Sequence, residues 1–338
     1  MPKVLVILWA PFGFRASELA KELDAQVASI TFLYGPRYFA PIRYLVLFFR
    51  SMFLLAQTRP DVVYAQNPPI FCPLTCLLYC RLTGARLVID HHAIWSVKTM
   101  GGKSPLSRGI AFLERAVSRA ADASTTPHSM WGRMLVEMGA RNVLVYHDFV
   151  PKSQRWPDET LKRQMAEGPI LAIASHGGHP LERLEVEAAA VGREREAGVS
   201  LVISGPTEKL ATRFASLALP PNVKYAGFLK RDVYESLKAS ADFALNITDE
   251  PYTLSHVLFE FVANSLPVIS SKQPVVEELF GGSLLYSDST VEDVAEKVGQ
   301  LCSGPARAEW SAKVRAKQEQ LTAMHEEEVA ALIGLVKG

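Results

Sequence analysis

Short apolar segments alternate with longer helix-like segments along almost the whole chain, and this alternation constrains the fold more than any other feature. The apolar segments are rich in β-branched residues, as Val4–Leu8 and Ile170–Ala174 illustrate. Such alternation predicts parallel sheets with helices on both faces. The expected strands are Val4–Leu8, Val27–Ile30, Val62–Ala65, Leu87–Ile89, Ala123–Thr125, Val143–Tyr146, Ile170–Ala174, Leu201–Ser204, Val223–Tyr225, Phe243–Ile247, Val268–Ser270 and Leu284–Tyr286.

The pattern breaks once, in a polar, proline-bearing stretch from Pro151 to Gly168, and then starts again. A length of 338 residues allows two domains, each with its own core. We therefore expect an α/β protein with two doubly wound, Rossmann-like domains that face a central cleft, one at 1–163 and one at 164–310. The Ala-, Glu- and Lys-rich end, 311–338, is expected to form helices that pack back toward the N-terminal domain.

The charge balance gives no argument for a nucleic-acid partner, because 36 basic and 35 acidic residues leave a formal charge of +1. Three of the four cysteines, Cys72, Cys76 and Cys80, recur at a spacing of four and have no His or Asp within that run. We interpret them as buried small hydrophobic residues and not as metal ligands. Free cysteines suit a reducing compartment, so we expect a cytoplasmic protein.

The segment from Phe39 to Gln57 is apolar around almost its whole helical circumference, apart from Arg43 and Arg50, which share a face. Two interpretations stay open, a helix lying in a membrane interface and a core helix with two snorkelling arginines. The first would place the protein on the cytoplasmic face of a membrane as a peripheral protein. The chain has no charge-free apolar segment of about 20 residues, so we expect no transmembrane span.

The stretch from Asp242 to Lys272 predicts a binding site for a nucleotide-sugar. It indicates a buried strand, a polar loop, a helix that carries Glu260, and a second apolar strand. The backbone N–H groups of a first helical turn bind a diphosphate, and a carboxylate deeper in the helix accepts hydrogen bonds from both ribose hydroxyls. The expected first turn consists of Thr253, Leu254, Ser255 and His256.

Ligands of open parallel sheets bind at the carboxyl ends of the strands, which nominates further loops. Gly177 and Gly178 follow the first strand of the second domain and adjoin His176. Gly13 opens the first helix, where a glycine either lets the backbone approach a ligand or simply allows a turn, and Arg15 suits a phosphate on an acceptor. The other candidates in these loops are Gly205, Phe228 and Leu229 on the donor side and Phe14 on the acceptor side.

The region from Pro60 to Trp95 carries a strand, a QNPP loop, a small-residue helix and a second strand that ends in Asp-x-His. It resembles the chitobiosyldiphosphodolichol β-mannosyltransferases. The C-terminal half is also similar to the bacterial family 4-like glycosyltransferases, which share the GT-B fold. The matching residues of the N-terminal half are Gln66, Asn67, Pro68, Pro69, Asp90 and His92.

The resemblance implies transfer of a hexose from a UDP- or GDP-linked donor to a lipid-linked or polysaccharide precursor acceptor. It places the donor on the C-terminal domain and the acceptor on the N-terminal domain, with Asn67 on the acceptor side and His92 against the transferred sugar or the phosphates. Asp90 acts as a general base, orients a histidine or is structural, and these alternatives stay open. No metal or other cofactor is expected, because helix dipoles and hydrogen-bond donors stabilise the departing diphosphate.

Three departures from the family pattern keep the reaction open. Tyr252 stands where retaining enzymes carry a second Glu, Val257 stands where related transferases carry a Lys, and Ser175–Gly178 replaces a basic pair. Inversion and retention therefore both remain possible outcomes. The alternatives are a nucleotide-sugar epimerase of the same fold and a non-catalytic scaffold protein of a glycan-assembly complex.

Overall fold

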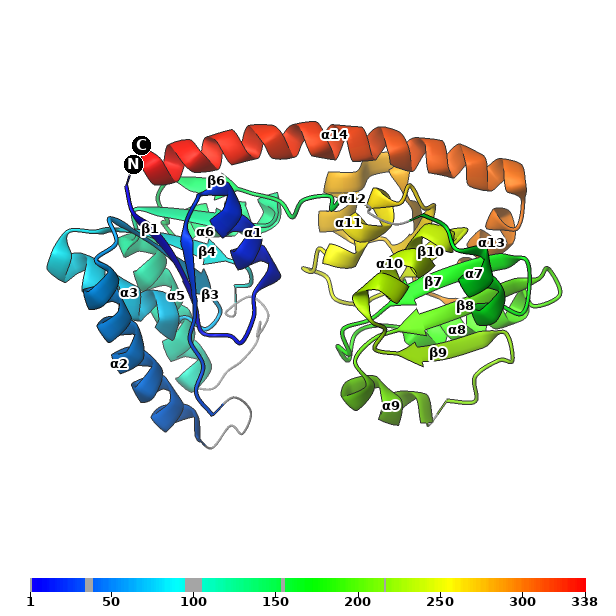
Figure 1. Cartoon of the computed structure of the whole chain (residues 1–338), viewed down its shortest axis with the longest axis horizontal. Helices are drawn as coiled ribbons and strands as arrows, with labels where there is room; N and C mark the ends of the chain where they lie inside the picture. The colour runs from blue at the N-terminus through cyan, green and yellow to red at the C-terminus, as the bar shows by residue number, and fades with distance from the viewer. Residues whose placement is uncertain (1, 34–38, 95–104, 153–155, 216) are drawn as a thin grey trace. The chain divides into compact units, whose positions relative to one another are not determined.

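The computed structural model describes residues 2–33, 39–94, 105–152, 156–215 and 217–338 (Figure 1). The chain forms two compact units, the first made of Met1–Asp148 with Met324–Gly338 and the second of Phe149–Ala323. The predicted boundary after residue 163 falls inside a helix, α7 (Glu159–Met165), which belongs to the second unit. The chain ends in one continuous helix, α14 (Gly304–Lys337), where several helices were predicted.

The first unit contains a six-stranded sheet in the order β2-β1-β3-β4-β5-β6, with parallel pairing throughout. Its strands are β1 (Val4–Leu8), β2 (Gln26–Ser29), β3 (Val62–Asn67), β4 (Arg86–His91), β5 (Ala123–Thr126) and β6 (Val143–Val145). Its helices are α1 (Phe14–Glu22), α2 (Ala40–Thr58), α3 (Phe71–Thr83), α5 (Pro105–Ala120), α6 (Ser129–Glu137) and the end of α14.

Alternate residues of β1 enter different cores, which shows that this sheet is covered on both faces. Leu5 and Ile7 pack with the buried residues of α2 and α3, whereas Val6 packs with Leu19 of α1 and Leu332 of α14. Successive strand residues point to opposite faces, so a strand that is apolar at every position needs two covers. The doubly wound arrangement follows from this.

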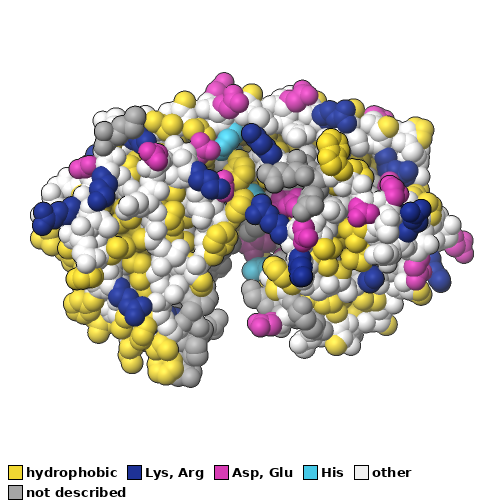
Figure 2. All heavy atoms as spheres, viewed as in Figure 1, with side chains coloured by type: hydrophobic (Ala, Val, Ile, Leu, Met, Phe, Trp, Pro, Cys, Tyr) yellow, Lys and Arg dark blue, Asp and Glu magenta, His cyan; other side chains and the backbone are white. Residues whose placement is uncertain are grey.

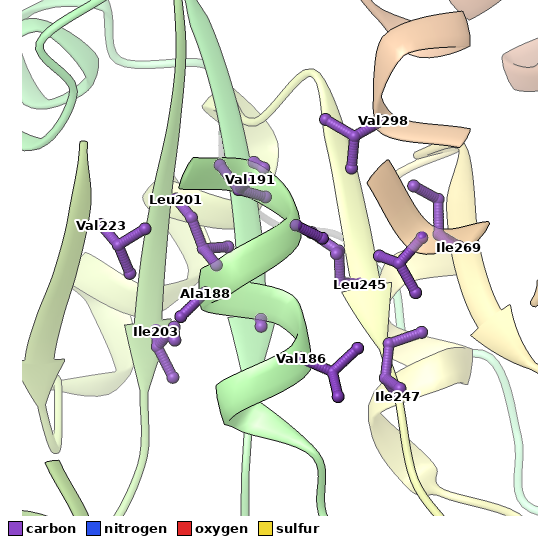
Figure 3. Packing of buried hydrophobic residues seen from close by; sticks show 14 of the residues in the cluster. Val186, Ala188, Val191, Leu201, Ile203, Val223, Leu245, Ile247, Ile269 and Val298 are labelled. Atoms are coloured by element: carbon purple, nitrogen blue, oxygen red, sulfur yellow. The ribbon is translucent and has the colours of Figure 1, made fainter. Parts of the chain in front are cut away.

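The second unit contains a six-stranded parallel sheet in the order β12-β11-β10-β7-β8-β9. Figure 3 shows its core, in which Ala188 and Val191 of one helix lie toward Leu201 and Ile203 of β8, while Val186 of the same helix lies toward Ile247. Its strands are β7 (Ile170–Ser175), β8 (Val199–Ser204), β9 (Val223–Gly227), β10 (Phe243–Asn246), β11 (Val268–Ser271) and β12 (Leu285–Ser287). Its helices after α7 are α8 (Leu184–Arg193), α9 (Thr207–Ala215), α10 (Arg231–Ser240), α11 (His256–Ala263), α12 (Pro274–Phe280), α13 (Val291–Leu301) and the start of α14.

All the strands expected from the sequence overlap strands of the structure, and the predicted α/β class with two doubly wound parallel sheets is confirmed. Each sheet has one point where the strand order reverses. In the first unit this switch lies between β1 and β3, and in the second between β7 and β10. Loops leave in opposite directions there and open a crevice at the carboxyl ends of the strands, where ligands of such sheets bind.

Helix α2 lies on the surface of the first unit and is unusually apolar. It is long and apolar enough to cross a membrane by length and composition, yet only 17% of its most apolar window is buried. Leu47, Ser51 and Leu55 are its buried residues, and the two leucines pack in the core of the unit. Arg43 and Arg50 donate hydrogen bonds to the carbonyl oxygens of Leu33 and Thr31. The helix is therefore attached to the sheet along one side and exposes apolar side chains on the other.

Candidate functional site

Glu260 lies one turn inside α11, at the switch point of the second sheet. Ser255 has an extended backbone and is the N-cap, so the helix begins at His256. The prediction that Thr253 opens this helix is corrected, since Thr253, Leu254 and Ser255 form the half-buried loop before it. Serine favours the N-cap position, which explains where the helix begins.

The carboxylate of Glu260 is partly exposed and is held by two side chains of α10. Oε2 accepts hydrogen bonds from the hydroxyl of Tyr234 at 2.9 Å and from Nζ of Lys238 at 3.1 Å. Oε1 lies 3.9 Å from Nε2 of His256, and the side chain is 21% exposed. The carboxylate is thus neither sealed in apolar packing nor left without partners. Oε2 is fixed by protein donors, and about a fifth of the side chain stays exposed.

Tyr234 and Lys238 were not identified from the sequence. They lie four residues apart on α10, a spacing that places both on one helix face. Lys238 is 1% exposed, its Nζ also donates to Glu235 at 3.1 Å, and it lies over the ring of Tyr234. Burial, together with the charge of Glu260, raises the pKa of Tyr234 well above its usual value, so this hydroxyl stays a hydrogen-bond donor. Their spacing of four residues was the only signal in the sequence that they share a helix face. No local sequence pattern indicated that this face of α10 contacts Glu260 on α11.

The Gly177–Gly178 loop follows β7, next to β10 in the sheet. Its amides already bind an anion of the protein. The carboxylate of Glu182 accepts from the backbone N–H of Gly177 at 2.7 Å, of Gly178 at 2.9 Å and of His179 at 2.9 Å. Gly178 has φ of +80°, a conformation that glycine adopts without strain. An incoming phosphate has to displace Glu182 to reach these amides.

His176 directly precedes this loop, and its imidazole contacts two carboxylates. Its Nε2 is 2.6 Å from Oε2 of Glu187 and its Nδ1 is 3.7 Å from Oε2 of Glu182. Burial lowers the pKa of His176, but the charge and hydrogen bond of Glu187 outweigh burial, and the pKa is raised above its usual value. His176 is 5% exposed and bonds carboxylates of the protein, so its predicted contact with the donor stays a prediction.

The remaining donor-side candidates lie at the ends of β8 and β9. Gly205 is buried, and a Cβ there would lie 2.4 Å from the carbonyl oxygen of His176 and 2.5 Å from Cδ1 of Leu210. Packing within the protein therefore explains this glycine. Phe228 is 79% exposed and Leu229 is half-buried, so both are accessible to a ligand.

In the first unit, Arg15 and Asp90 form a buried ion pair. Nε of Arg15 lies 3.1 Å from Oδ2 of Asp90, and its Nη1 lies 2.9 Å from Oδ1 of Asp148. Burial lowers the pKa of Arg15, but the two carboxylates outweigh burial and raise it above its usual value. Asp90 is 1% exposed and also accepts from the hydroxyl of Thr125 at 2.9 Å. Arg15 thus pairs with carboxylates of the protein where an acceptor phosphate was predicted, and the partners of Asp90 match the structural alternative among its three predicted roles.

Asn67 is also internal. It is 0% exposed, and its Nδ2 lies 3.2 Å from Nδ1 of His91 and 3.3 Å from Oε1 of Glu114. Asn67 thus contacts side chains of the protein, and the acceptor contact proposed for it stays a prediction. His91 is fully buried, and this burial lowers its pKa to about 4, while Asp90 has a smaller opposite effect. His92 is exposed directly after β4, at the carboxyl edge of the sheet, so it remains the accessible catalytic candidate of this unit.

The loop between β1 and α1 contributes Gly13 and Phe14. A Cβ at Gly13 would lie 2.7 Å from Cδ1 of Leu8 and 3.2 Å from Oε1 of Gln66. The absence of a side chain is thus needed for packing of the turn. Phe14 is half-buried at the start of α1. Among the residues that the structure describes, no three His, Cys, Asp or Glu side chains come together as metal ligands.

Comparison with sequence families assigns both units. The model of the family described as "Glycosyl transferase 4-like domain" matches residues 4–146. The model described as "Glycosyl transferase-like" matches residues 181–331. No curated protein matches the sequence at a significant level.

Solved structures with the same fold are distant in sequence. HepE of Anabaena, solved in complex with UDP-glucose, is 14% identical, with a TM-score of 0.72 over 100% of this chain and 98% of HepE. Sucrose-phosphate synthase from Thermosynechococcus elongatus is 13% identical, with a TM-score of 0.78 over 99% of this chain and 98% of the synthase. WaaG, a glycosyltransferase involved in lipopolysaccharide biosynthesis, is 13% identical, with a TM-score of 0.70 over 98% of this chain and 100% of WaaG. Because glycosyltransferase models match both units and the fold is shared with these proteins, the chain belongs to the glycosyltransferases of the GT-B fold.

Proposed function

We propose that the protein transfers a hexose from a UDP-linked donor to a lipid-linked glycan precursor at the cytoplasmic face of a membrane. The observation that carries the proposal is the arrangement of Glu260, whose Oε2 is held by Tyr234 and Lys238 while the side chain remains 21% exposed. A carboxylate fixed by one oxygen and accessible through the other suits the paired hydroxyls of a ribose. GDP-linked donors are the second choice.

The donor contacts of the proposal all come from the second unit. Ribose binds Glu260, and the diphosphate lies at the amino end of α11, where the helix dipole and backbone N–H groups favour an anion. His256, within 3.9 Å of Glu260, adds a donor at the same place. The exposed ring of Phe228, after β9, lies against the base. HepE, which has this fold, binds UDP-glucose, and this supports a UDP-linked hexose as the first donor to test.

In the proposed reaction an acceptor hydroxyl forms a bond to the anomeric carbon, the bond from that carbon to the diphosphate breaks, and UDP leaves. The hydroxyl proton has to pass to a base, and exposed His92 is our candidate, since Asp90 is buried in its ion pair. Protein donors at the start of α11 stabilise the charge on the departing diphosphate without a metal ion. The anomeric proton coupling of the product distinguishes inversion from retention.

The membrane part of the proposal rests on α2. Ile42, Leu45, Phe49 and Phe53 follow one another along its outer side and are 54% to 65% exposed. Hydrophobic side chains accordingly gather over α2 on the face seen in Figure 2. The helix contains no acidic residue, and its two arginines suit anionic head groups. We infer that this surface, the α2 face, inserts into the head-group region of a membrane.

The proposal is tested by incubating the purified protein with radiolabelled UDP-glucose, UDP-galactose or GDP-mannose and vesicles that contain polyprenyl-diphosphate-linked saccharides. We expect label from a UDP-sugar to pass into the lipid-extractable product, with wild-type protein but not with Glu260→Ala. Added EDTA should leave the rate unchanged. Isomerised donor in the absence of acceptor would instead assign an epimerase, and nucleotide binding without any turnover would assign a scaffold protein.

A further inference from the structure

We propose that an apolar groove in the first unit binds the hydrocarbon chain of the lipid acceptor. The inference rests on the proposed function, because it names the part of the acceptor that this unit recognises. The groove is formed by the side chains of Trp9, Tyr44, Phe48, Phe71, Leu74 and Leu78, and we call it the aromatic groove.

The aromatic groove lies at the switch point of the first sheet. Trp9 directly follows β1, and Pro68 and Pro69 directly follow β3, its neighbour in the sheet. Three adjoining cavities of about 440, 340 and 160 Å³ meet here and share Tyr44 in their linings. These cavities therefore lie side by side around Tyr44, at the carboxyl ends of β1 and β3 and beside α2 and α3. This is the edge of the sheet where ligands bind in doubly wound folds.

The walls of the aromatic groove present ring faces and not unsatisfied polar groups. The indole Nε1 of Trp9 donates to Oγ of Ser51 at 2.8 Å, and the Trp9 and Tyr44 rings stack with centroids 6.1 Å apart. Tyr44 also contacts Phe71, with centroids 4.7 Å apart. The hydroxyl of Thr75 donates to the carbonyl oxygen of Phe71 at 2.8 Å. A wall of aromatic rings, in which the polar atoms of Trp9 and Thr75 bond within the protein, gains most from an apolar occupant.

The cavity of about 440 Å³ beside the groove contains a cationic side chain. It is lined by Arg43 and Thr31 among others, and its described lining contains no acidic residue. The guanidinium of Arg43 lies over the ring of Tyr44 at 5.5 Å. The apolar aromatic groove beside this cationic cavity complements an amphiphile that carries an anionic phosphate on a long hydrocarbon chain. This pairing of charge and apolar surface favours a lipid phosphate over a neutral peptide.

The aromatic groove connects to the α2 face. Phe48, in the groove wall, contacts the ring of Phe49 on the outer side of α2, with centroids 5.3 Å apart. Leu78, at the other wall, is 44% exposed, so the groove is open there. A chain that leaves a membrane beneath the α2 face therefore enters the groove past apolar side chains. The same surface that meets the membrane thus delivers the acceptor to the sheet edge.

The test uses photo-crosslinking with farnesyl phosphate that carries a diazirine at the end of its chain, applied to the full-length protein. We expect label on the peptide that spans Phe71 to Leu78, competed by unlabelled farnesyl phosphate but not by inorganic phosphate. Leu78→Asp places a charge at the groove mouth and should reduce this label about tenfold. The matched control is Leu82→Asp, one turn further along α3 at a residue that is 71% exposed and does not line the groove, and it should label like wild type.

Equal labelling of wild type and Leu78→Asp would overturn the proposal. So would label confined to the α2 face, or label displaced by an unrelated apolar peptide but not by farnesyl phosphate. The crosslinking experiment needs no donor and no turnover. If the protein crosslinks farnesyl phosphate but transfers no sugar, the proposed function is wrong while lipid binding in the aromatic groove is supported. If transfer occurs, Leu78→Asp should raise KM about tenfold for a farnesyl-linked acceptor and leave KM for a water-soluble acceptor with the same sugar unchanged. Equal KM changes for both acceptors would contradict lipid binding in the groove and leave the proposed transferase function supported.

Discussion

Nζ of Lys238 lies 3.1 Å from Oε2 of Glu260, and this contact determines which oxygen of the carboxylate faces the protein. Lys238 also bonds Glu235, so one buried cation is shared by two carboxylates on different helices. Such a cation fixes the Glu260 side chain without occupying its second oxygen.

Tyr234→Phe should weaken UDP binding about fivefold, because a single net hydrogen bond contributes about 1 kcal/mol to holding Glu260 in place. The measurement is titration calorimetry with UDP. The matched control is Tyr225→Phe, which removes a hydroxyl that donates to the carbonyl oxygen of Gly205 at 3.2 Å and has no contact with Glu260. Equal losses in both variants would show that Tyr234 has no special role.

Asp90→Asn should reduce the free energy of unfolding by about 3 kcal/mol, because it removes one partner of the buried Arg15 ion pair. The turnover number of the folded fraction should change little. Urea unfolding and transfer rates measured on the same preparation check both expectations. A general base at Asp90 would give the opposite pattern, a loss of turnover of about a thousandfold with unchanged stability.

Acidification should destabilise the protein through His91. Its pKa is about 4 in the folded state, below the ordinary value of 6.5, so the unfolded chain takes up a proton that the folded protein does not. Stability is therefore present above pH 6.5 and falls as the pH drops toward 4, by about 2 kcal/mol at pH 5. The difference in urea-unfolding free energy between pH 7 and pH 5 should be smaller by this amount in His91→Gln.

His179→Gln is the control for that series. His179 has a side chain that is 52% exposed, so its replacement removes a histidine without changing the buried core. A His91→Gln variant with the wild-type pH dependence would mean that His91 does not resist protonation in the folded protein.

The double variant Phe49→Asp/Phe53→Asp should abolish binding to anionic phosphatidylglycerol vesicles. Each phenylalanine is more than 60% exposed on the α2 face, and burying such a side chain contributes about 2 kcal/mol. Loss of both, about 4 kcal/mol, should lower the partition about a thousandfold. Co-sedimentation with vesicles provides the measurement. Trp156→Asp, in the second unit at a residue that is 86% exposed, should sediment like wild type. Unchanged sedimentation of the double variant would refute the membrane role of α2.

The sequence was sufficient for the fold because apolar runs such as Val4–Leu8 and helix-like segments alternate with the periods of strand and helix. Every expected strand is present, and the matches to the family models fit the predicted reaction class. Glu260 was also identified correctly as a carboxylate at the carboxyl edge of a sheet, since both the strand and the following helix are visible in the local pattern.

Side-chain partners were not predictable, because they come from distant parts of the chain. Asp148 reaches Arg15 across 133 residues, and Asp90 reaches it across 75. A charged residue in a loop at the sheet edge therefore has the same sequence signature whether it faces a ligand or a buried counter-charge. His176 illustrates this, since Glu187 on the next helix removes it from the surface. The aromatic groove was missed for the same reason, because its residues come from the loop after β1 and from α2 and α3.

The affinity of Glu260→Ala for UDP, measured by titration calorimetry, tests the central claim most directly. Glu235→Ala is the matched control, because Glu235 bonds the same Lys238 at the same 3.1 Å but has no proposed contact with the donor. We predict at least a tenfold weaker affinity for Glu260→Ala, about 1.4 kcal/mol, with a native melting curve and wild-type affinity in the control. Wild-type affinity for UDP in a folded Glu260→Ala protein would contradict the account.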